Sequence, residues 1–82
     1  MRRLSVAIVV AAPIIREGVA AIIGHNPNLR IVGTVDSTVD LQVLMRNTEM
    51  DVIVADVALQ RDIEAVAELQ RLPIVGLQST LI

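Results

Sequence analysis

Residues 4–24 have the sequence LSVAIVVAAPIIREGVAAIIG, and this stretch decides the fold. Its first part, residues 4–10, is a continuous apolar run rich in β-branched side chains, which is typical of a strand buried on both faces of a sheet. Pro13 follows where a helix can start, because its missing N–H would have no partner in the first turn. Gly24 predicts the end of that helix. The apolar residues that recur between them at helical spacing are Ile14, Ile15, Val19, Ile22 and Ile23.

Three more strands and two more helices are predicted downstream. Residues 29–35, 52–55 and 74–77 are apolar runs of strand length. The segment Ser37-Thr38-Val39-Asp40 resembles a capping box, so a helix is expected from there to about Asn47. The inward-facing positions of the last helix are expected to be Leu59, Ile63, Val66, Ala67 and either Leu69 or Leu72.

The alternation of strands and helices predicts one α/β domain over residues 1–82. Parallel strands joined by right-handed crossovers predict a flavodoxin-like open sheet of order 2-1-3-4 with three helices. Ligands of such sheets bind beyond the carboxyl ends of the strands, where the strand order reverses. That point lies between the first and third strands, so residues 10–12 and Asp56 are expected to converge there.

Composition excludes several classes of function. Hydrophobic residues make up 54% of the 82 residues and none is aromatic, so a core of Val, Ile, Leu and Ala is expected and disorder is excluded. The net charge is -2 and the seven basic residues, all arginine, are scattered, so the basic patch of a nucleic-acid binder is missing. The chain has no cysteine and no glycine-rich phosphate loop. His25 lies in a predicted turn and is expected at the surface, because a metal or catalytic site needs partners.

Residues 1–15 also permit another interpretation. A basic start, an apolar run and small residues near Ala11 and Ala12 resemble a signal peptide. Pro13 and the unbroken continuation into a helical pattern favour a strand instead. No apolar stretch approaches the about 20 residues that a membrane span needs.

Residues 9–18, VVAAPIIREG, resemble the start of response-regulator receiver domains, especially the NarL/FixJ-like subclass. In that subclass an apolar strand ends in Asp-Asp-His-Pro and continues into an Arg-Glu-Gly helix. The proline and the Arg-Glu-Gly run match here. Val10 and Ala11 stand in place of the acidic pair, and Ala12 stands in place of the histidine.

Two later segments extend the resemblance and also depart from it. Residues 51–56, DVIVAD, resemble the third receiver strand, whose last Asp accepts a phosphoryl group from a histidine kinase, and Asp56 holds that position. The following loop, residues 57–62, is about two residues shorter than in the family and has neither Pro nor Gly. Residues 72–79 resemble the fourth strand, with Gln78 where the family has Thr or Ser. The family's fifth strand and the lysine at its end have no counterpart.

The resemblance implies the regulatory module of a cytoplasmic two-component transcription factor, N-terminal to a DNA-binding output domain outside this chain. It covers essentially the whole chain, which is expected to be a truncated, atypical receiver without the fifth strand and the last helices. The missing acidic pair and lysine imply no phosphoryl transfer, no bound metal, no cofactor and no enzymatic activity. Asp56 is then expected to be a relic that accepts hydrogen bonds from the loop after it. Its alternatives are a non-phosphorylated switch and a working phospho-acceptor.

Self-association is the expected activity of such a domain. Without a fifth strand, the fourth strand has an unpaired edge, and one face of residues 52–55 lacks a covering helix. Apolar surface is therefore expected to face water there and on Ile74, Val75 and Leu77. The sequence predicts a homodimer that conceals these residues.

A small-molecule sensor is the alternative function. Its ligand would occupy the apolar pocket left at Val10 and Ala11 by the lost acidic pair. Arg16 and Glu17 are expected on a solvated helix face, and Asp51 is expected to be a solvated residue at a strand boundary.

Overall fold

The computed structural model describes residues 3–59, 61–65 and 72–77 of the 82-residue chain. The elements that it contains are β1 (Leu4–Val9), α1 (Pro13–Gly24), β2 (Leu29–Val35), α2 (Thr38–Asn47), β3 (Val52–Asp56), the 3-10 turn η1 (Val57–Leu59) and β4 (Ile74–Leu77). Residues 61–65 are also helical. Each predicted strand is therefore present within one residue of its predicted bounds, and α1 and α2 are confirmed.

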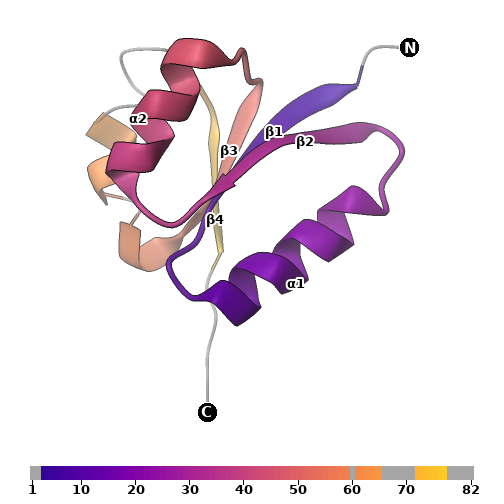
Figure 1. The fold of residues 1–82 in the computed structure, drawn as a ribbon, viewed down its shortest axis with the longest axis horizontal. Helices are drawn as coiled ribbons and strands as arrows, with labels where there is room; N and C mark the ends of the chain where they lie inside the picture. The colour runs from indigo at the N-terminus through magenta and orange to yellow at the C-terminus, as the bar shows by residue number, and fades with distance from the viewer. Residues whose placement is uncertain (1–2, 60, 66–71, 78–82) are drawn as a thin grey trace.

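The four strands form one parallel sheet of order β2-β1-β3-β4, as predicted (Figure 1). The central strands β1 and β3 align with Val9 opposite Ala55. Helix α1 lies on one side of the sheet, and α2 with the short helical segments after β3 lies on the other (Figure 1). Both central strands are covered from two sides, which explains why their sequences are continuous apolar runs.

The buried residues divide into two clusters, one on each face of the sheet. The α2-side cluster consists of Ala7, Val9, Leu41, Met50, Ile53, Ala55 and Ile63. The α1-side cluster consists of Val6, Ile8, Val10 and Val54. Neighbours along β1 alternate between the clusters because successive side chains of a strand point to opposite faces.

Helix α1 contacts the sheet with only one of its apolar stripes. Ile15, Val19 and Ile23 pack against the α1-side cluster, whereas Ile14 and Ile22 are 85% and 75% exposed. Each residue turns about 100° around the helix axis, so Ile14 and Ile22 point away from the sheet that their neighbours contact. Helical spacing alone did not separate these two groups.

Helix α2 begins as its sequence predicts. The Ser37 Oγ accepts a hydrogen bond from the backbone N–H of Asp40 at 3.2 Å, and the helix ends at Asn47. Its Leu44 packs so closely over β2 that a Cβ on Gly33 would lie 2.6 Å from a Leu44 methyl carbon. Glycine at position 33 therefore permits the close contact between helix and sheet.

The predicted third helix is described only over residues 61–65. Ile63 is fully buried there in the α2-side cluster. Leu59 of η1 and Leu72, which precedes β4, pack against that cluster. Val66, Ala67 and Leu69 lie outside the described residues. Among the helices of the described ranges, none combines the length and apolar character that a membrane crossing requires.

Candidate functional site

The carboxyl ends of β1 and β3 meet where the strand order reverses, and we call this place the switch point. Because Val9 pairs with Ala55, the next residues along the chain, Val10 just after β1 and Asp56 at the end of β3, lie side by side. The structure thus brings together the two segments that the sequence predicted to converge. Open parallel sheets place ligands at such a point.

Asp56 is half-buried at the end of β3. Its Oδ1 accepts a hydrogen bond from the backbone N–H of Ala58 at 3.0 Å. This is a local turn of the kind that Asp side chains form with the backbone two residues ahead. The predicted hydrogen bond between the carboxylate and the following loop is confirmed.

The two positions of the missing acidic pair have different surroundings. The Val10 side chain is fully buried in the α1-side cluster, and Ala11 is exposed. Neither side chain offers an oxygen atom, although Mg²⁺ takes near-octahedral oxygen ligands. Within the described residues, no three His, Cys, Asp or Glu side chains come together as a metal site would require. The side chains of Val10 and Ala11 therefore do not fit Mg²⁺ as ligands.

Arg16 lies at the switch point, which the sequence did not predict. Its Nη1 donates hydrogen bonds to the carbonyl oxygens of Val10 at 2.9 Å and Ala11 at 3.4 Å. The expectation of a solvated Arg16 is therefore wrong, whereas Glu17 is exposed as expected. The missed signal is the distance from Pro13: a residue three positions after a helix start is close enough to the preceding turn to contact it.

Asp51, just before the start of β3, also forms hydrogen bonds that were not predicted. Its Oδ2 accepts a hydrogen bond from the backbone N–H of Ser5 at 2.7 Å, and its own N–H donates to the Ser5 carbonyl oxygen at 2.8 Å. Asp51 therefore joins the beginnings of β1 and β3 and is half-buried. The prediction of a solvated boundary residue is wrong, because the parallel pairing of two distant segments places the Ser5 backbone beside it.

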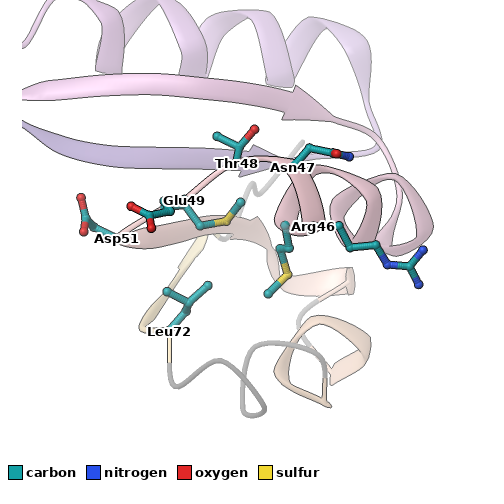
Figure 2. A pocket seen from close by; sticks show the side chains of 8 residues that line it. Arg46, Asn47, Thr48, Glu49, Asp51 and Leu72 are labelled. Carbon is teal, nitrogen blue, oxygen red and sulfur yellow. The ribbon is translucent and has the colours of Figure 1, made fainter.

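A cavity of about 420 Å³ lies at this same edge of the sheet, away from the switch point. It is lined by Met45, Arg46, Asn47, Thr48, Glu49, Met50, Asp51 and Leu72. Figure 2 shows Glu49 and Asp51 together on one side and Arg46 at the other end. Val10, Ala11 and Asp56 are not among its lining residues, so this cavity is not the ligand pocket that the sequence suggested.

The residues predicted for self-association separate onto the two faces of the sheet. Ile74 is half-buried and packs against the α2-side cluster, so its expected exposure is wrong. Val75 points to the opposite face and is 51% exposed. The side chain of Leu77 and all of Gln78 lie outside the described residues.

The expected exposure of one face of β3 is also wrong. Ile53 and Ala55 are fully buried, Val54 is 8% exposed and Val52 is half-buried. Ile53 and Ala55 lie in the α2-side cluster with Leu41 and Ile63, and Val54 lies in the α1-side cluster, against which Ile15 and Val19 of α1 pack. Elsewhere, His25 is exposed at the end of α1, as predicted.

Comparison with known proteins adds one structural relationship. No protein-family model and no curated protein matches the sequence. Among solved structures, the chain is similar to the RcsB response regulator of Salmonella typhimurium, in a structure concerned with conformational dynamism for DNA interaction of that protein. The TM-score is 0.78 and the sequence identity is 18%, and the match covers 98% of this chain and 44% of the solved chain. The chain therefore spans less than half of that regulator's length and has its receiver-like fold, as the resemblance of the motifs predicted.

Proposed function

We propose that this chain is a regulatory domain of the response-regulator type that acts by self-association and without phosphoryl transfer. The observation that carries the proposal is the switch point itself. It keeps Asp56 at the family's position, but its carboxylate is engaged by Ala58 and its neighbours Val10 and Ala11 are apolar. Phosphoryl transfer depends on positioning and on neutralising crowded oxygens, usually with Mg²⁺. The chain lacks the carboxylates that would hold the ion and has no lysine.

We assign self-association to two exposed apolar patches on the α1 side of the sheet, Ile14, Gly18 and Ile22 on α1 and Val75 on β4, and together we call them the α1-side surface. The two isoleucines and Val75 are more than half exposed, and Val75 pairs with Val54 and so lies on the same sheet face as the α1-side cluster. A Cβ at Gly18 would meet no atom within 4 Å, so packing within one chain does not require glycine there. Glycine inside a helix costs about 1 kcal/mol relative to alanine.

A second copy of the chain fits this surface by symmetry. Ile14 and Ile22 lie four residues on either side of Gly18, so a two-fold axis near Gly18 would place Ile14 against Ile22 of the partner subunit. Small residues at the crossing point let two helices approach closely.

The expected dimer is weak. Burying the exposed parts of Ile14, Ile22 and Val75 contributes roughly 5 kcal/mol per protomer, at about 1.5–3 kcal/mol for each fully buried side chain. Two protomers together contribute roughly 10 kcal/mol, which is comparable to the about 4–15 kcal/mol that association costs. With the association cost at the lower end of that range, the net gain is about 6 kcal/mol, which corresponds to a dissociation constant of roughly 40 μM.

Sedimentation equilibrium tests the proposal directly. The wild-type chain is expected to show a concentration-dependent dimer near ~100 μM. Ile22→Glu is expected to remove it, because dimer formation would then bury a charge. Val39→Glu is the matched control, since Val39 is 69% exposed on α2, on the other side of the sheet. A wild-type monomer, or equal behaviour of both variants, contradicts the proposal.

The biological setting that we propose follows from the family resemblance. Response regulators join a receiver domain to an output domain, and the solved regulator is described in terms of DNA interaction. We assign DNA contact to such an output domain and not to this chain, whose net charge is -2 with scattered arginines. The setting is then transcription control in the cytoplasm, with no enzymatic step in this chain.

A further inference from the structure

Arg16 is a charged residue of α1 that contacts the β1–α1 turn, residues 10–12. Because α1 begins at Pro13, the Arg16 side chain lies one turn into the helix and reaches back toward the strand. Its Nη1 donates to the carbonyl oxygens of Val10 at 2.9 Å and Ala11 at 3.4 Å. Hydrogen bonds from a charged donor are stronger than those from a neutral one.

The turn is held at two further points by its own backbone. The Val10 N–H donates to the Val35 carbonyl oxygen of β2 at 3.1 Å, and the Arg16 N–H donates to the Ala12 carbonyl oxygen at 2.9 Å. The guanidinium adds to these bonds, because it donates to the carbonyl oxygen of Val10, the residue just after β1. Across the switch point, Oδ1 of Asp56 accepts a hydrogen bond from the Ala58 N–H.

We infer that Arg16 is a built-in cation that fixes the β1–α1 turn and holds the switch point in one conformation without a metal ion. Arg16 is a positioning residue in this role and takes part in no reaction. The inference deepens the proposed function and rests on it for the statement that the switch point works without Mg²⁺.

NMR-detected amide exchange on the full chain tests the inference. The reporters are the amides of Val10 and residue 16, whose hydrogen bonds close the turn, and the reference is the Ile53 amide, which donates to Pro73 at 3.0 Å. Arg16→Gln is expected to speed exchange of both reporters about tenfold through local opening, with Ile53 unchanged. Arg16→Lys is expected to restore protection in part, because an ammonium group donates to the same carbonyls.

The neighbouring substitution Glu17→Gln is the matched control and is expected to leave both reporters unchanged. Millimolar Mg²⁺ is expected to add no protection to either protein. Unchanged exchange in Arg16→Gln, an equal rise at Ile53, failure of lysine to restore any protection, or protection by Mg²⁺ each overturns the inference. Two measurements separate the two proposals. If the wild-type chain is monomeric in sedimentation while Arg16→Gln still speeds amide exchange, self-association is rejected and the role of Arg16 in fixing the turn is retained.

Discussion

An aspartate lies at each end of β3, and each side chain accepts a hydrogen bond from a backbone N–H, but the two partners differ in how far away they are in the sequence. Asp51 at the amino end bonds to Ser5, which is 46 residues away in the sequence, whereas Asp56 at the carboxyl end bonds to Ala58, two residues ahead. The amino-end carboxylate therefore joins two strands, and the Ala58 hydrogen bond of the carboxyl-end carboxylate lies within its own turn. Asp56, at the position that resembles the receiver phospho-acceptor, thus has the more local of the two hydrogen bonds.

Removing the amino-end carboxylate is expected to have the largest effect. Asp51→Ala leaves the part-buried Ser5 N–H without this acceptor, and an unsatisfied buried donor costs about 1–3 kcal/mol. The free energy of unfolding, measured by urea denaturation, should fall by about 2 kcal/mol. Asp36→Ala, at an exposed position after β2, is the control and is expected to change it by less than about 0.5 kcal/mol.

A smaller effect is expected at the other end of the strand. Asp56→Ala removes a local hydrogen bond, which contributes about 0.5–1.5 kcal/mol, and water can replace the carboxylate there. Asp56→Asn keeps an acceptor oxygen and should be nearly neutral. Both variants should dimerise like the wild type in sedimentation experiments. A loss of stability as large as that of Asp51→Ala would reverse the comparison between the two ends, and loss of dimerisation in a folded Asp56→Asn would indicate a switching role.

No effect at all is expected from a phosphoryl donor. Incubation with acetyl phosphate and Mg²⁺ should leave the intact mass unchanged, because Asp56 has no acidic pair and no lysine beside it. A receiver domain with all of these residues serves as the positive control. One stable added phosphate that disappears in Asp56→Asn would show that the carboxyl end retains its chemistry.

The elements of the fold could be predicted closely from the sequence. Apolar β-branched runs identified the four strands, and Pro13 and Ser37 identified the starts of α1 and α2. These signals are local, because a strand buried on both faces and a helix start each depend on residues close together in the chain. The strand order was predicted from right-handed connections together with the flavodoxin-like arrangement.

The site could be predicted only in outline. The sequence indicated that Val10 and Asp56 converge, but it assigned Arg16 and Asp51 to solvent. Both side chains find backbone partners on other segments, the β1–α1 turn and the start of β1. No local pattern reports such a partner, because it depends on the direction of a side chain relative to a neighbouring element.

The sequence by itself determined the layered α/β fold and the apolar character of the switch point, because periodicity and residue chemistry are properties of the chain alone. The tertiary structure decided which apolar residues are buried and which polar groups are paired. It covered β3 more completely than expected, left Ile14 and Ile22 exposed on α1, and placed the Leu44 side chain closely over Gly33. Burial and long-range hydrogen bonds arise only when distant segments pack together, so they depend on the three-dimensional arrangement and not on any local run of residues.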